Sequence, residues 1–158
     1  MVDLYFIKQF MGITKFNSTV ALITDKDDAK TVINKINRFS IIAIQAENHE
    51  LIQHFNIDLV LNIVSMGEMH PSFVSEYFRD IRRLYKTDKN LYFYCCKRLE
   101  KTMPDGSVTK FLEYPWEKED QIIVDELCPW HKEYYSFTPP FYKKFDGPIQ
   151  HQIRIMHN

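Results

Sequence analysis

The sequence predicts a single α/β domain with a mostly parallel sheet, flanking helices and an antiparallel last strand. Apolar runs of strand length, at 40–45, 57–64 and 90–96, alternate with segments whose apolar residues recur at helical spacing. Strands that alternate with helices in this way form βαβ units and a right-handed parallel sheet. Residues 149–156 instead alternate apolar and polar side chains, which is typical of an antiparallel strand near a sheet edge.

The first third of the chain is expected to begin with a helix that starts just after Asp3, within residues 1–16. Asp3 would cap this helix and Gly12 would end it. After it we expect a strand (19–23), a helix through 29–36 with acidic capping residues before it, a buried strand (40–45) and a short helix (49–55).

In the central segment, the spacing of apolar residues changes from that of a buried strand to that of a helix. The run 57–64 is apolar almost throughout and predicts a strand buried on both faces, as a parallel sheet requires. Pro71 suits the first position of a helix over 72–84. The opposite, solvated side of that helix is expected to carry Arg79, Asp80, Arg82 and Arg83.

Polar residues fill the connection between this strand and this helix: Asn62, Ser65, Glu68 and His70, with Gly67 among them. Ligands of open α/β sheets bind at the carboxyl ends of the strands. The connection is therefore the predicted functional site.

The remainder of the chain divides into a strand, an excursion and a last strand. Residues 90–96 are again apolar on both faces, and they end the α/β core (1–96). Residues 97–148 are rich in proline and aromatic side chains, with a turn at 104–106 and one short strand around 121–124. This excursion either walls a pocket or covers the core. The last strand lies within 149–158.

The amino-acid composition limits the classes of binding partner to be expected. Lysine and arginine number 20 against 21 acidic residues, so neither nucleic acid nor an acidic membrane surface is an expected partner. A membrane span or signal sequence is not evident, and we expect a cytoplasmic protein whose three cysteines are reduced thiols. The four glycines lie too far apart for a glycine-rich phosphate loop.

The segment Asp58-Leu-Val-Leu-Asn-Ile-Val-Ser-Met-Gly-Glu-Met69, Tyr77 in the helix that follows, and the terminal His151-Gln-Ile-Arg-Ile together resemble a known family. They are similar to the sugar O-methyltransferases among the class I S-adenosylmethionine-dependent methyltransferases. The resemblance implies a Rossmann-like sheet with a reversed last strand, and methyl transfer from S-adenosylmethionine to a sugar hydroxyl.

The resemblance also implies cofactor-binding positions. Asp3 matches the acidic residue that holds the ribose, and the loop Gln45, Ala46 and Glu47 matches the one that flanks the adenine. Asn62 and Ser65 match the strand end beneath the methionine part. The family's first strand and its glycine loop have no counterpart here, so we expect either a C-terminal piece of a longer protein or a chain that has lost its cofactor site.

Methyl transfer to a hydroxyl needs a base for the departing proton, and the candidates are His70 and Glu68. His70 suits the base near neutral pH, with Glu68 orienting it or binding sugar hydroxyls. Simpler interpretations stand beside these. His70 is then a surface residue before Pro71, Glu68 a carboxylate favoured by the helix dipole, and Asn62 a partner of strand-end backbone groups. His131 and His151 are weaker candidates, and no metal site is expected because the ligand spacing is missing.

Two hypotheses about function follow, one catalytic and one non-catalytic. The chain is either the acceptor-binding part of a methyltransferase, which needs a missing N-terminal segment or a partner, or a non-catalytic α/β module. Loss of the first strand would uncover a sheet edge, so homo-oligomers are expected in the second case.

Overall fold

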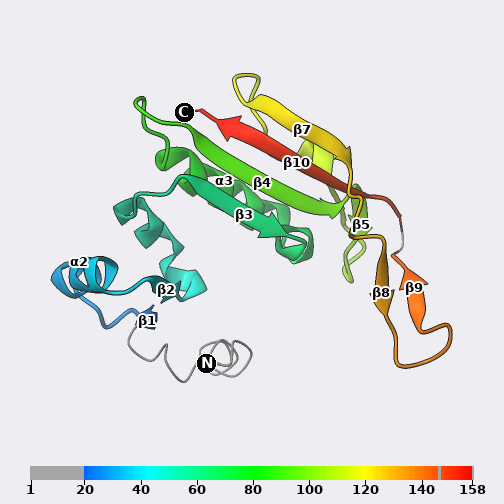
Figure 1. Cartoon of the computed structure of the whole chain (residues 1–158), viewed down its shortest axis with the longest axis horizontal. Coiled ribbons are helices and arrows are strands. Elements are labelled where there is room, and N and C mark those ends of the chain that lie inside the picture. Colours follow the sequence, from blue (N-terminus) through cyan, green and yellow to red (C-terminus); the bar gives the residue numbers. More distant parts are fainter. Residues whose placement is uncertain (1–19, 146, 158) are drawn as a thin grey trace. The chain divides into compact units, whose positions relative to one another are not determined.

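The computed structural model describes residues 20–145 and 147–157 (Figure 1). The predicted N-terminal helix with Asp3 and Gly12 lies outside these residues. The chain divides into two compact units, 1–55 and 56–158, and each is described by itself. Within them the prediction of an α/β chain with both parallel and antiparallel strands is confirmed.

The described part of the first unit is a strand, a helix and a strand, followed by a 3₁₀ helix. Strands β1 (Val20–Ile23) and β2 (Ile41–Ile44) pair in parallel, with α2 (Ala29–Arg38) between them in sequence. Asp28 caps α2 by accepting a hydrogen bond from the Thr31 N–H at 2.8 Å. The positions of the strands and of α2 agree with prediction, but β2 was expected to be buried and is half-buried along its length. The short helix is the 3₁₀ helix η2 (Ala46–His54), which begins three residues earlier than expected.

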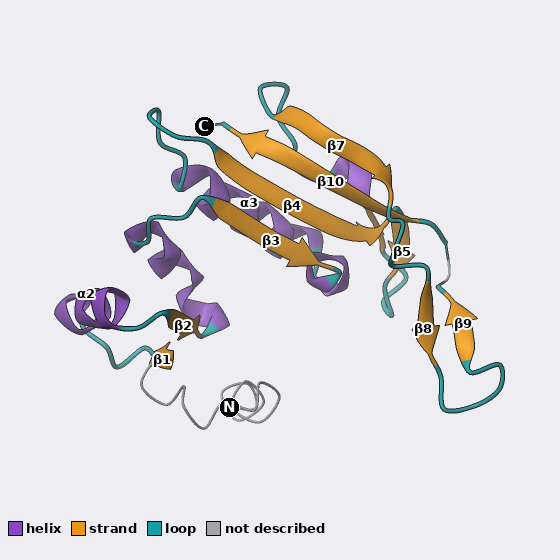
Figure 2. Cartoon of the chain, in the orientation of Figure 1, coloured by secondary structure: helices purple, strands orange, loops and turns teal. Residues whose placement is uncertain are grey.

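The second unit is built on a four-stranded sheet in the order β3-β4-β10-β7 (Figure 2). Strand β3 (Leu59–Ile63) runs parallel to β4 (Leu91–Arg98). Strand β10 (Ile149–Met156) is antiparallel both to β4 and to β7 (Gln121–Leu127). The antiparallel last strand is thus confirmed, and it lies one strand in from the edge.

Helix α3 (Pro71–Arg83) covers one face of this sheet, and its bounds agree closely with prediction (Figure 2). The core between them is aromatic. Phe78 of α3 meets Phe93 of β4 edge-on at 5.5 Å between ring centroids, and Trp116 at 4.8 Å. Both Phe78 and Phe93 are almost completely buried. Edge-to-face contacts of this kind add to the stabilisation that comes from the apolar area the helix buries.

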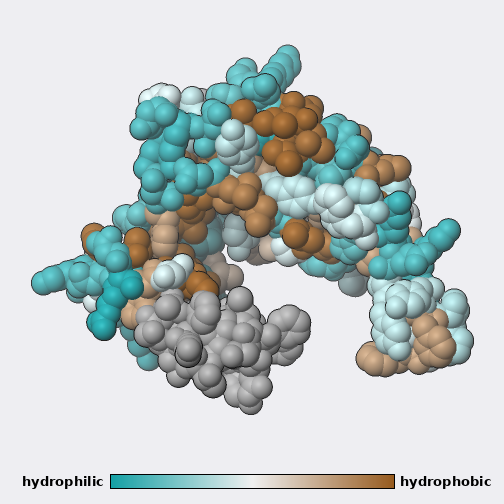
Figure 3. Space-filling view, viewed as in Figure 1, coloured by the Kyte–Doolittle hydropathy of each residue, from teal (hydrophilic) through white to brown (hydrophobic). Residues whose placement is uncertain are grey.

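The prediction that β3 is buried on both faces is wrong. The side chains of Leu59, Leu61 and Ile63 are 51%, 61% and 57% exposed, whereas Asn62 between them is buried. Alternate residues of a strand face opposite sides, so only the face toward α3 is covered. The described helices of this unit leave the other face open, and Figure 3 shows apolar residues on it. The apolar run is not evidence of burial here.

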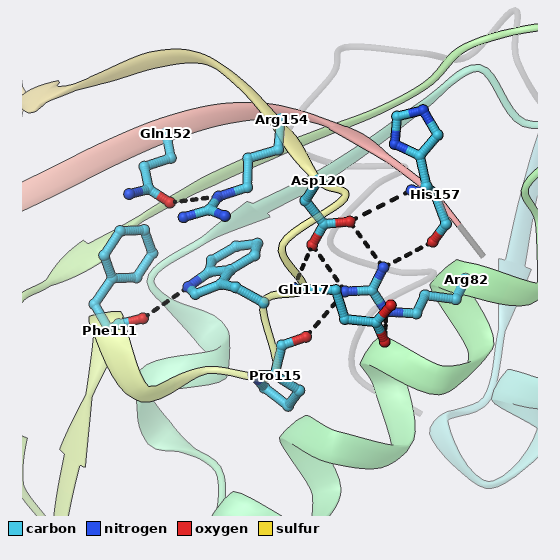
Figure 4. Close-up of polar contacts among 9 residues, drawn as sticks. Arg82, Phe111, Pro115, Glu117, Asp120, Gln152, Arg154 and His157 are labelled. Carbon is cyan, nitrogen blue, oxygen red and sulfur yellow. Dashed lines mark hydrogen bonds and ion pairs between the residues drawn. The ribbon is translucent and has the colours of Figure 1, made fainter.

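The prediction of a solvated side for α3 is wrong at Asp80 and Arg82, which are both buried. Arg82 donates two hydrogen bonds of 2.8 Å to the two carboxylate oxygens of Asp120 (Figure 4). It also donates to the backbone carbonyls of His157 at 2.7 Å and Pro115 at 3.0 Å. Arg82 lies four residues after Phe78, so it continues the core stripe and ties α3 to the segments before β7 and after β10.

The excursion after β4 holds more regular structure than the one short strand predicted. Its predicted strand is β7, which is longer than expected. Two hairpins flank it: β5 (Glu100–Thr102) with β6 (Val108–Lys110), and β8 (Glu133–Tyr135) with β9 (Tyr142–Lys144). The predicted turn at 104–106 joins β5 and β6, and Gly106 adopts a φ of 85° there. The 3₁₀ helix η4 (Phe111–Glu113) leads into Tyr114 and Trp116, which cover the core.

Candidate functional site

The carboxyl ends of β3 and β4 form the candidate site, and its first feature is a strained backbone. Val64, directly after β3, has a φ of 70° and a ψ of −35°. A positive φ is rare for a β-branched residue. The Val64 N–H donates to the carbonyl of Cys96 at 2.7 Å, and the 3₁₀ helix η3 (Ser65–Glu68) follows at once. Strained backbone of this kind concentrates at functional sites.

Asn62 holds the turn that follows Val64. Its amide donates to the Ser65 hydroxyl at 2.6 Å, and its carbonyl oxygen accepts from the Met66 N–H at 3.4 Å. The interpretation of Asn62 as a partner of strand-end backbone groups therefore has direct support. The exposed Ser65 keeps its own hydroxyl proton for a further partner.

The buried amine of Lys97 lies beneath this turn, and sequence reasoning missed it. Lys97 is 1% exposed, and its Nζ donates to the Tyr114 hydroxyl at 2.6 Å while lying 4.4 Å from the centroid of the same ring. A Cβ added to Gly67 would come within 3.4 Å of Lys97 Cε, so glycine gives the turn its close approach to this side chain. The sequence signal that could have found it is the alternation of faces along a strand. Lys97 falls on the same buried face of β4 as Leu91, Phe93 and Cys95.

Burial shifts the pKa of both Lys97 and Tyr114. Removal from water lowers the pKa of Lys97 to about 8, and the neighbouring charge of Lys101 acts in the same direction. Glu68 acts in the opposite direction, as does Cys95. Burial also raises the pKa of Tyr114, so this hydroxyl keeps its proton and accepts the lysine hydrogen bond through oxygen.

A pocket opens at the ends of β3 and β4, and Lys97 is part of its lining. Glu68 lies at it, and its carboxylate forms an ion pair with Lys101. Phe145 and His131, whose rings meet edge-on at 4.6 Å, form another part of its lining. Its lining residues come from the position after β3, from η3, β4 and β5, from both sides of the β8–β9 hairpin and from β10: Val64, Gly67, Glu68, Lys97, Arg98, Lys101, His131, Phe145 and Ile149.

His70 lies outside the residues that line this pocket and caps α3. Its Nδ1 accepts a hydrogen bond from the Ser72 N–H at 3.3 Å, with the Ser72 hydroxyl at 2.9 Å. The ring is exposed. Because Nδ1 accepts this bond, the neutral ring carries its proton on Nε2.

The predicted cofactor positions are divided between the units. Gln45, Ala46 and Glu47 are exposed at the start of η2 in the first unit. Asn62 and Ser65 lie with Glu68 and His70 around one turn of the second. Asp3 lies outside the described residues.

The remaining histidines and cysteines of the second unit have structural contacts. His151 is buried against Trp130, with its Nε2 at 3.3 Å from Glu126. Cys96 and Cys128 are free thiols packed with Ile149. Over the described ranges, no three histidine, cysteine or acidic side chains meet as metal ligands would, and no helix has the length and apolar character to cross a membrane.

Comparison with known proteins adds no relative: the chain matches no protein-family model, no curated protein and no solved structure. Function is therefore inferred from the geometry at the ends of β3 and β4.

Proposed function

We propose that the second unit is the acceptor-binding part of an S-adenosylmethionine-dependent O-methyltransferase that methylates a sugar hydroxyl. The observation that carries this proposal is the turn Val64–Glu68, which lies over a pocket at the carboxyl ends of two parallel strands. Sheets of this kind bind ligands at that end. The antiparallel β10 beside β4 also agrees with the Rossmann-like sheet and reversed last strand that the resemblance implies.

The described residues do not fit a complete site for S-adenosylmethionine. Backbone can approach a nucleoside closely where glycines are grouped. The described glycines are isolated: Gly67 faces Lys97, and a Cβ at Gly106 or Gly147 would meet nothing within 4 Å. The Asn62 side chain is engaged with the turn. We therefore derive no step through the cofactor and consider only the acceptor.

The acceptor hydroxyl must lose a proton as its oxygen is methylated, and Glu68 is the group that can take it. Its carboxylate lies at the pocket, and Lys101 holds it through an ion pair. His70, expected from sequence to be the base, has its Nδ1 lone pair directed at the Ser72 N–H. This cap bond favours proton transfer to Glu68, with His70 holding the start of α3 in place.

A transfer assay with methyl-labelled S-adenosylmethionine and a panel of sugars tests the proposal. We expect labelled sugar from the natural chain, and a loss of about 10²-fold in kcat for Glu68→Gln, because general bases contribute roughly that factor. Glu113→Gln is the matched control, since Glu113 is also an exposed carboxylate paired with a lysine, Lys110, at 3.0 Å. Absence of labelled sugar, or equal turnover by the Glu68→Gln variant, would contradict the proposal.

A second candidate function is a non-catalytic module that associates with copies of itself. It is favoured by the open apolar face of β3, where Leu59, Leu61 and Ile63 are each more than half exposed. Among the described residues, β3 pairs with β4 alone, so its outer edge offers free backbone groups to another strand.

A further inference from the structure

Lys97 is a buried cation without a buried anion. Its Nζ has three donor hydrogens, and the hydrogen bond to Tyr114 uses one. Tyr114 is neutral, and the nearby carboxylate of Glu68 is paired with Lys101. Buried ammonium groups are costly unless an opposite charge and hydrogen bonds compensate them. Within the described residues, Lys97 lacks that compensation.

Arg82 is a second buried cation in the same unit, and its charge is neutralised within the protein. Asp120 meets it with both carboxylate oxygens at 2.8 Å, Glu117 lies 3.0 Å from its Nε, and two backbone carbonyls accept its other hydrogen bonds. Arg82 therefore needs no ligand. The contrast with Lys97 is informative because Lys97 lines a pocket.

The pocket beside Lys97 carries an excess of positive charge. Lys97, Arg98 and Lys101 contribute three cations, and Glu68 contributes one carboxylate. Arg98 lies 5.7 Å above the Phe145 ring and His131 packs against the same ring, so both stay near the pocket. Apolar lining from Val64, Phe145 and Ile149 strengthens the field of these charges by excluding water.

We propose that this pocket binds an oxyanion, a carboxylate or phosphate, which the Lys97 ammonium pairs with beneath the turn at Gly67. If the proposed function holds, this oxyanion belongs to the acceptor, and the substrate class is an acidic sugar: a sugar acid or a sugar phosphate. The unit then recognises its acceptor at two points, the anion at Lys97 and the hydroxyl near Glu68.

Binding should depend on the charge of Lys97. Its pKa of about 8 in the free protein rises when an anion is bound, so affinity is constant just below this pH and falls above it, by up to about tenfold per pH unit. The titratable and charged groups around Lys97 and its pocket are Tyr114, Cys95, Glu68, Lys101, Arg98 and His131. The window between about pH 7 and 9 brackets the pKa of Lys97.

Calorimetric titration of the full chain without S-adenosylmethionine tests the site. The probes are glucuronate, glucose 6-phosphate, inorganic sulfate and neutral glucose. We expect the anions to bind and glucose to bind at least about tenfold more weakly, since a hydrogen bond to a charged group changes affinity by roughly 10- to 100-fold. Glucuronate against glucose 6-phosphate distinguishes the carboxylate from the phosphate. Sulfate does not titrate in the chosen window, so it reports the pH dependence of Lys97.

Three variants locate the binding. Lys97→Met keeps the length of the side chain and removes its charge, and should weaken anion binding roughly 10- to 100-fold. Gly67→Ala places a methyl group 3.6 Å from Lys97 Nζ and should also weaken it without removing any charge. Lys110→Met removes an exposed lysine of β6 and should leave affinity unchanged.

Equal affinity in Lys97→Met and the natural chain would overturn the proposal, as would equal binding of glucose and glucuronate or no heat from any anion. The outcome is separable from that of the methyl-transfer assay because no cofactor is present. Anion binding at Lys97 without methyl transfer would retain the oxyanion site and remove the proposed function. Methyl transfer without anion binding would do the reverse.

Discussion

Two buried cations of the second unit differ in what neutralises them. Arg82 pairs with Asp120 and Glu117, whereas within the described part of the chain Lys97 has only the neutral phenol of Tyr114 as its hydrogen-bond partner. Burial by itself raises the pKa of Asp120, but hydrogen bonds from Arg82 and the Glu117 N–H, with the charge of Arg82, hold that pKa below its ordinary value. The Arg82 pair thus stabilises the folded chain at neutral pH, whereas the charge on Lys97 destabilises it.

Replacement of Arg82 should destabilise the folded chain strongly. Arg82→Met leaves Asp120 buried and unpaired, and we expect the free energy of unfolding to fall by about 3–5 kcal/mol. Arg79→Met is the control, because Arg79 is exposed on the same helix and should change this free energy by less than about 0.5 kcal/mol. Urea unfolding followed by circular dichroism measures both. Equal midpoints for the two variants would show that the Arg82 network does not anchor α3.

Lys97 should give stability an identifiable pH dependence. Its folded pKa of about 8 lies below the ordinary lysine pKa of 10.5, so the unfolded chain binds more protons between these values. Stability from this group therefore rises with pH from about 8 to 10.5, and the charge costs stability below that window. Cysteine and tyrosine titrate in the same range, so the difference between the natural chain and Lys97→Met isolates the lysine.

We expect that difference, natural chain minus variant, to become more favourable by up to about 3 kcal/mol across the window. Unfolding curves measured at intervals of pH give it directly. A difference that stays constant with pH would mean that Lys97 titrates normally and is not buried as a cation.

At the scale of elements, the start of α3 is organised by His70 and Pro71. Pro71 occupies the first turn, where a missing N–H is harmless, and His70 Nδ1 caps the helix through Ser72. The strained Val64 and the turn over Lys97 lie immediately before this cap. A stable helix start therefore fixes one end of the candidate site.

Substitutions at His70 can separate capping from catalysis. His70→Ala should lower the free energy of unfolding by about 1 kcal/mol, whereas His70→Asn should retain most of it because asparagine is a strong cap. If capping is its role, His70→Asn also retains methyl transfer. Loss of turnover in both variants, with stability kept in His70→Asn, would return the imidazole to the role of base.

Long periodic elements were predictable from sequence, and short polar ones were not. The strands β3, β4 and β10 and the helix α3 each show a clear period over several residues. The hairpins β5–β6 and β8–β9 have strands of three largely exposed residues, which carry no such signal. In the site, the turn after β3 was found because its polar residues stand out from an apolar run. Lys97 was missed because a lysine after such a run is typical of a strand end in solvent.

At the scale of the whole molecule, the open face of β3 bears on association. Exposed apolar sheet surface favours contact with another copy. We expect the natural chain to associate with itself, and Leu61→Lys to weaken that association by about tenfold or more, since a charge placed in an apolar contact costs over 1.4 kcal/mol. Leu112→Lys changes an equally exposed leucine on η4 and is the control.

Sizing with light scattering over a range of concentrations measures this association. A natural chain that stays monomeric at about 1 mM, where even contacts worth roughly 4 kcal/mol would be half formed, would rule the self-associating module out.

The most direct test of the central claim, an acceptor site at the carboxyl ends of β3 and β4, is a map of the backbone amide resonances of the ¹⁵N-labelled chain during titration with glucuronate and glucose 6-phosphate. We predict that the largest shifts fall on Gly67, Glu68, Lys97 and Lys101, and that Lys97→Met abolishes them. Shifts centred elsewhere, or shifts at these amides that persist in Lys97→Met, would contradict the account.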